Sequence, residues 1–180
     1  MKRTPLFTGA MSGALALLAL GTGQARGAAG EAGEIAAITA ARITPTRAIA
    51  IAEGRTHGRA FGMGLEVAPS GTWYEVQLNV GGKPMLARVA PESGRFLGIA
   101  AARGEDADGL HSLDGHPLTL AGAITAAERH AGGRALEAGP YGKGPYAHYD
   151  VDVVKAGAVS HWSVNADTGT VTPAPAAEQD

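Results

Sequence analysis

The chain has no cysteine, which excludes disulfides, thiol chemistry and a lipid anchor attached through cysteine. Aromatic residues make up only 5% of the 180 residues, so the core must rest on Val, Ile, Leu and a few Tyr and Trp side chains. Neither charge sign dominates, because 15 Lys and Arg residues face 17 Asp and Glu residues and the formal net charge is −2. No basic stripe could follow phosphates, so binding to nucleic acid is not expected.

The first 25 residues are typical of a secretory signal. A positively charged start at positions 2–3 precedes an apolar run over 6–20, and small residues at Gly23 and Ala25 suit cleavage after position 25, with Ala29 as a later alternative. A membrane anchor is the other interpretation, but the run is short for a spanning helix and no charged stop follows it. No twin-arginine pair is present, so we expect ordinary secretion, to the periplasm or the exterior, and no stable membrane span after cleavage.

From residue 43 onward the chain repeats itself with an offset of 75 residues and no gap. Identical residues recur in this register: Thr44 and Thr119, Ala48-Ile49 and Ala123-Ile124, Ala52-Glu53 and Ala127-Glu128, Tyr74 and Tyr149, Val89 and Val164, Gly94 and Gly169. The sequence therefore predicts two tandem units, 43–99 and 118–174. Units of this size are marginal alone, so we expect them to pack together. A flexible lead-in with room for one short helix (26–42), a polar linker (100–117) and a loose tail (175–180) complete the predicted organisation.

Each unit is predicted to be one helix followed by short antiparallel strands, which gives an α+β fold with two tandem helix-plus-sheet units. In the first unit, Thr44 is a good N-cap and Pro45 suits the first helical position. Gly58 is expected to end this helix. The second unit repeats the plan from its own threonine cap.

The clearest predicted strand pair is the hairpin around Gly81-Gly82. The preceding strand alternates apolar and polar residues, and closing the hairpin at the two glycines pairs Tyr74 with Val89. The same register places Glu75 opposite Arg88, an opposite-charge pair on the other face. A slip by one residue would mix the two faces, so the register is well specified.

Several of these residues resemble the PepSY domain: a capped helix with Ala-Ile and Ala-Glu, a Tyr-x-Val strand, and an ending of the form Val-x-Ala-x-Thr-Gly-x-Val. The ending at 164–171 is the closer match, although Asn165 stands where the family usually has aspartate. The first unit departs further, with Ala90-Pro91 in place of the Asp-Ala pair. The resemblance implies a helix packed on a small antiparallel sheet and no shared catalytic residues.

Modules of this family occur in propeptides of secreted zinc metallopeptidases and in cell-envelope proteins, where they bind or restrain peptidases or act as sensing and interaction modules. The resemblance therefore implies a secreted or periplasmic protein without enzymatic activity, whose partner is an envelope or secreted protein such as a peptidase. Exposed strand edges and Trp73 are the expected contact elements, through strand addition or aromatic anchoring.

A patch of possible metal ligands is predicted on the second hairpin. A turn centred between residues 156 and 157 places Asp152 opposite His161, with His148 and Asp150 on the same outward face. Imidazole and carboxylate groups together can bind a divalent transition metal, which gives an alternative function as a metal-binding envelope protein. A solvated sheet face with ordinary polar alternation is the simpler interpretation of the same residues.

An enzyme is not expected. Ser160 lies near His161 and Asp152 in the sequence, but the strand alternation turns the serine to the opposite face. The chain has no nucleophile elbow, zinc-peptidase helix motif or phosphate-binding loop.

Overall fold

The computed structural model describes residues 28–104, 107 and 109–174. The predicted signal segment (1–25) and tail (175–180) lie outside the described residues. The elements are α1 (Ala28–Ala40), α2 (Pro45–Thr56), β1 (Arg59–Ala68), β2 (Gly71–Val80), β3 (Lys83–Val89), β4 (Phe96–Ala101), α4 (Leu120–Ala131), β5 (Arg134–Tyr141), the 3₁₀ turn η1 (Gly144–Tyr146), β6 (His148–Lys155), β7 (Ala158–Asn165) and β8 (Val171–Pro173).

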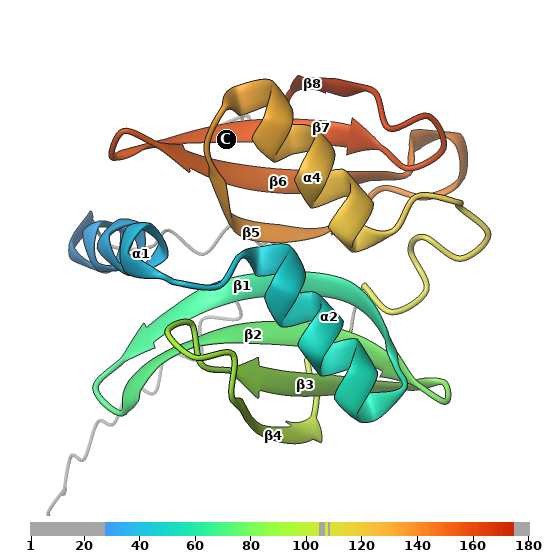
Figure 1. Ribbon diagram of the computed structural model, residues 1–180. Helices are drawn as coiled ribbons and strands as arrows, with labels where there is room; N and C mark the ends of the chain where they lie inside the picture. Colours follow the sequence, from blue (N-terminus) through green and yellow to red (C-terminus); the bar gives the residue numbers. More distant parts are fainter. Residues whose placement is uncertain (1–27, 105–106, 108, 175–180) are drawn as a thin grey trace, which may run out of the picture.

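All eight strands form one antiparallel sheet in the order β4-β3-β2-β1-β5-β6-β7-β8. Helices α1, α2 and α4 cover the same face of this sheet, with α2 over the first unit's strands and α4 over the second unit's strands (Figure 1). The predicted α+β class is confirmed. The core lies between the helices and the sheet and is continuous across both units.

The two units join through a seam between β1 and β5. Met63 pairs with Ala138, and Gly64 pairs with Glu137. Met63 and Ala138 are themselves separated by the repeat offset of 75 residues. The units therefore meet at equivalent positions, as two copies related by a local two-fold axis do.

A buried glutamate bridges helix and strand in both units. Glu53 Oε1 accepts a hydrogen bond from the Ala60 N–H (2.9 Å), and Glu128 Oε1 accepts one from the Ala135 N–H (2.9 Å). In both strands the ladder is irregular directly after the alanine, so the glutamate satisfies a backbone donor where the regular pairing breaks. Burial raises the pKa of Glu128, and the Ala135 N–H and the Arg134 guanidinium counteract this rise.

A buried tyrosine fixes the start of the helix in both units. The Tyr74 hydroxyl donates to the Ile43 carbonyl (3.0 Å), and the Tyr149 hydroxyl donates to the Leu118 carbonyl (2.9 Å). Each carbonyl belongs to the residue before the helix N-cap, so the bond sets how the chain enters the helix. Burial raises the pKa of Tyr74 to about 12 and also raises the pKa of Tyr149.

Helix α2 begins as predicted and ends differently. Thr44 Oγ1 accepts a backbone N–H of the first turn (3.1 Å), and Pro45 occupies the first helical position. The left-handed C-cap is His57 (φ 55°), not Gly58. Gly58 is needed for a different reason: a Cβ there would lie 2.7 Å from Val80 Cγ2, so only glycine lets the strand start this close to β2.

The β2–β3 hairpin has the predicted register. Tyr74 pairs with Val89, and Glu75 pairs with Arg88. Both glycines of Gly81-Gly82 have positive φ (59° and 81°), which the tight turn requires.

The prediction of a flexible lead-in over 26–42 is wrong for its described part, which forms helix α1. Ile38 is fully buried against the core, because α1 packs on β1 and β5 beside the seam. The Arg134 guanidinium binds the C-terminal end of α1 through the carbonyls of Ile38 (3.2 Å) and Ala41 (2.6 Å), where a cation also complements the helix dipole. Among the described residues no single helix is long and apolar enough to span a membrane, and α1 and α2 pass that test only as a pair bent by 82°.

The predicted linker over 100–117 is less separate than its composition indicates. β4 extends into it as far as Ala101, two residues beyond the expected strand end. Leu113 is only 8% exposed and belongs to the common core. The linker lies beside the seam on the side opposite α1 (Figure 1).

Candidate functional site

The sheet face turned away from the helices is free of helix packing, and we call it the open face (Figure 1). It receives every second side chain of each strand. The predicted site residues all lie on it: Trp73, His148, Asp150, Asp152 and His161.

Trp73 is held in place by its neighbours on the open face. The guanidinium carbon of Arg88 lies 4.4 Å from the centre of the indole ring, and Arg88 Nε is 3.0 Å from Glu75 Oε2. The indole N–H points to the same carboxylate oxygen at 3.4 Å. A partner that stacks on this ring must therefore displace Arg88, and partner binding by Trp73 stays a prediction.

The four predicted metal ligands form two separate His–Asp pairs. Asp152 faces His161 in the predicted register, and His161 Nδ1 lies 2.6 Å from Asp152 Oδ1. His148 uses both ring nitrogens, Nδ1 towards the Tyr146 carbonyl (2.8 Å) and Nε2 towards Asp150 Oδ1 (3.2 Å). Burial, the largest cause, and the neighbouring Asp152 raise the pKa of Asp150, while His148 and His161 lower it. No group of three or more His, Asp or Glu side chains in the described part of the chain is placed to share one ion.

Metal binding at this patch stays a prediction, and titration with Zn, Cu and Ni tests it. The double variant His148→Ala, His161→Ala should lose the binding, because it removes both imidazole ligands. His111→Ala is the matched control, since His111 is a 68% exposed histidine in the linker. The hypothesis is abandoned if the unmodified protein binds none of these ions, or if the double variant binds them equally well.

Ser160 takes no part in a hydrolase-like arrangement. Its hydroxyl donates to the Val153 carbonyl (3.1 Å) and accepts the indole N–H of Trp162 (2.9 Å). It pairs with Val153 on the helix side of the sheet, whereas His161 lies on the open face. These two side chains are therefore not brought together.

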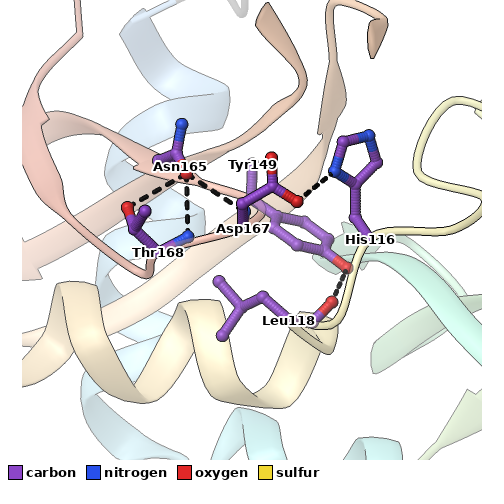
Figure 2. A network of polar contacts seen from close by, with 6 residues as sticks. All are labelled: His116, Leu118, Tyr149, Asn165, Asp167 and Thr168. Atoms are coloured by element: carbon purple, nitrogen blue, oxygen red, sulfur yellow. Dashed lines mark hydrogen bonds and ion pairs between the residues drawn. The ribbon is translucent and has the colours of Figure 1, made fainter. Parts of the chain in front are cut away.

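Figure 2 shows a polar network between the linker, the start of α4 and the β7–β8 turn. His116 Nδ1 lies 2.7 Å from Asp167 Oδ1, and the His116 side chain is only 13% exposed. Next to this pair, the Tyr149 hydroxyl donates to the Leu118 carbonyl. The network joins the linker to the turn that caps β7, so its role is to position the second unit's helix.

The Asn165 side chain organises the same turn (Figure 2). Its Oδ1 accepts from the Asp167 N–H (3.0 Å), the Thr168 N–H (2.8 Å) and the Thr168 hydroxyl (3.0 Å). An asparagine can replace the aspartate of the resembled family here because the turn needs an acceptor oxygen, and an amide supplies one.

The two edges of the sheet differ in how well they are protected. β8 is only three residues long and ends in Pro173. β4 is six residues long, contains neither charge nor proline, and exposes Leu97 (41%) and Ile99 (44%). Proteins normally shorten, charge or cover such an edge, so β4 is the least protected backbone edge of the sheet.

The backbone groups that β4 leaves unpaired can be assigned from its register. The Ala102 N–H donates to the Pro84 carbonyl (3.0 Å), and facing pairs in an antiparallel ladder alternate between bonded and non-bonded. Counting back from that bonded pair, Ile99 and Ala101 direct their N–H and C=O groups away from β3. Sequence reasoning named exposed edges in general but not this one. The available signal was the uncharged run between Arg95 and Arg103.

At the other edge the same count gives a different result. The Ala174 N–H donates to the His161 carbonyl (3.0 Å), so Val171 and Pro173 are the outward residues of β8. Pro173 has no N–H, and β8 therefore offers a single outward donor.

Helix-on-sheet units with a polar open face, one unprotected strand edge and no assembled catalytic constellation among the described residues define a class of non-catalytic module. Residues 117–172 match the family described as Peptidase propeptide and YPEB domain (PepSY). The resemblance is thus confirmed for the second unit, and for residues 43–99 it stays a prediction.

No curated protein matches the chain. A solved structure of a predicted lipoprotein from Clostridium difficile 630 is similar, with a TM-score of 0.41 and 17% sequence identity. The likeness covers 73% of this chain and 91% of that chain.

Proposed function

We propose that this protein is an extracytoplasmic, non-catalytic module that binds another protein, with a peptidase as the expected class of partner. The match over residues 117–172 to a family named for peptidase propeptides supports this proposal. The signal-like start of the chain supports the location. We also propose that residues 43–99 are a second, diverged copy of the domain, because both units use an equivalent buried glutamate and an equivalent buried tyrosine for the same backbone bonds.

The single observation that carries the binding role is the unprotected β4 edge. Ile99 and Ala101 turn hydrogen-bonding groups outward next to exposed apolar side chains. A strand of a partner protein can add to such an edge, gaining backbone hydrogen bonds and apolar contacts at once. The open face offers Trp73 as a second contact element.

Capture from envelope extract tests the function. The chain from residue 26 onward, which contains every described element, serves as cross-linked bait, and Ile99→Lys serves as the variant, because lysine on an edge strand opposes strand addition. Val67→Lys is the matched control, since Val67 is an equally exposed (44%) apolar residue on β1. Trp73→Ala tests the second contact element.

We expect one enriched peptidase whose activity falls when the bait is added, and whose capture is reduced by Ile99→Lys but not by Val67→Lys. Reproducible absence of any enriched protein overturns the binding role. Enrichment of proteins whose activity the bait leaves unchanged removes the peptidase from the proposal.

A further inference from the structure

We infer that the β4 edge accepts an extended segment with a β-branched centre and carboxylates after its C-terminal end, added antiparallel to β4 as a ninth strand. This inference deepens the proposed function and rests on it. Its basis is the backbone geometry of the edge, the size of its side chains and the distribution of charge along it.

The direction of the added strand follows from the sheet. Every pair of neighbouring strands is antiparallel, and the outward groups of Ile99 and Ala101 can exchange bonds with one residue each of an antiparallel strand. The C-terminal end of such a segment lies beside Phe96, where β4 begins.

The Phe96 end of the edge is positively charged. The Arg55 guanidinium carbon lies 5.7 Å from the Phe96 ring centre, and Arg95 directly precedes the strand. Both arginines are exposed, and neither forms an ion pair with a carboxylate among the described residues. Glu92, in the turn before β4, offsets one of these two charges. At the other end Arg103 is followed in the sequence by acidic residues at 105, 106 and 108, so a carboxylate is favoured only at the Phe96 end.

The side chains of β4 favour a partner strand with larger residues than its own. Gly98, Ala100 and Ala101 are small, and cross-strand stabilisation grows with the size and β-branching of the facing pair. A second copy of this chain, pairing β4 with β4, would mostly place small residues opposite small residues. Valine or isoleucine opposite the small residues fills that space better, so a segment of another protein fits the edge better than a second copy does.

The test uses labelled synthetic octapeptides and fluorescence anisotropy with the chain from residue 26 onward. The first peptide, Thr-Val-Thr-Ile-Thr-Val-Asp-Asp, carries its carboxylates at the C-terminal end, which is amidated so that only the side chains differ in position. The second peptide has the same composition with both aspartates moved to the N-terminal end. We expect the first to bind about fivefold more tightly at low salt, with the ratio falling towards one at high salt.

Two further arms place the peptide on the edge. Ala101→Pro removes an outward N–H without removing a bond to β3, and should weaken binding of the first peptide at least about tenfold. Val171→Pro makes the equivalent change at the β8 edge and should leave binding unchanged, with circular dichroism showing that both variants are folded. N-methylation of the peptide at the alternate residues that face β4 should abolish binding, whereas methylation at the intervening residues should not.

Equal binding of the two peptides overturns the charge assignment, and binding that survives both Ala101→Pro and N-methylation overturns the edge itself. Concentration-dependent dimerisation that Ala101→Pro abolishes shows that a second copy occupies the edge, which also overturns the inference. Capture of a peptidase that Ala101→Pro leaves intact keeps the proposed function while removing this site from it. Peptide binding as expected without any captured peptidase does the reverse.

Discussion

Leu65→Ala should lower the free energy of unfolding by about 2–5 kcal/mol, and it should do so for both units together. Leu65 is fully buried in β1, next to the seam with β5. Truncation removes apolar contacts and leaves a cavity that the surrounding strands cannot fill. Because the core is continuous across both units, this loss should not be confined to the first unit.

The two tryptophans of the chain allow each unit to be observed separately. Trp73 lies in β2 and Trp162 lies in β7, so Trp73→Phe and Trp162→Phe each leave one fluorescent reporter. We expect both reporters to show the same urea midpoint, and Leu65→Ala to shift both midpoints equally. Two different midpoints would show that the units unfold independently, contrary to a shared core.

Val67→Ala is the matched control for this measurement. Val67 lies two residues further along β1 but is 44% exposed, so its truncation should change the stability by no more than about 0.5 kcal/mol. A comparable loss in both variants would mean that the strand itself, and not burial, determines the effect.

Tyr74→Phe should destabilise the protein by about 1–2 kcal/mol near neutral pH and become the more stable form in strong alkali. The neutral-pH loss arises because the Ile43 carbonyl loses its donor. Burial raises the pKa of Tyr74 from 10.0 to about 12, so the folded state favours the neutral phenol. That contribution is complete below the unfolded pKa of 10.0 and is lost as the pH rises through about 12.

The lost contribution amounts to about 2.7 kcal/mol, from about 1.36 kcal/mol for each unit of pKa difference. Urea unfolding curves measured across this alkaline range should therefore show the wild type losing stability relative to Tyr74→Phe until the two cross. Tyr146→Phe is the control, because Tyr146 is 80% exposed and its replacement should leave the stability unchanged. A constant difference between wild type and Tyr74→Phe at all pH values would contradict the buried-phenol account.

Local patterns in the sequence were sufficient for the parts of the fold that local geometry determines. The Gly81-Gly82 turn and the alternation of β2 together specify one register, and the structure has it. The pairing of Asp152 with His161 was predictable for the same reason. Each of these depends on a tight turn between adjacent strands.

The seam could not be predicted in this way. β1 contains Gly62 and Gly64, which weaken its alternation, and no turn connects it to β5. Helix α1 was missed because its apolar residues are few, and its burial depends on the groove beside the seam, which exists only once both units are folded. His57 took the left-handed position expected of Gly58 because Gly58 was already required for the close approach to Val80.

The candidate site shows the same division. The two-residue period of a strand correctly placed Trp73, His148 and His161 on one face. It could not show that Arg88 covers the indole of Trp73, because that contact depends on side-chain rotamers. Nor could it show which edge is unprotected, since this depends on the order of all eight strands.

The pairing of Met63 with Ala138 has an evolutionary consequence. Strands that meet at equivalent positions of two repeated units reproduce the contact that two identical subunits make across a symmetry axis. Duplication of a gene for one self-associating unit, followed by fusion of the copies, yields this arrangement without any new interface. Fusion also makes the two flanks of the axis independent, and here α1 occupies one flank while the linker occupies the other. An ancestral homodimer, held together by its β1 edges, thereby becomes a single chain whose halves are free to diverge.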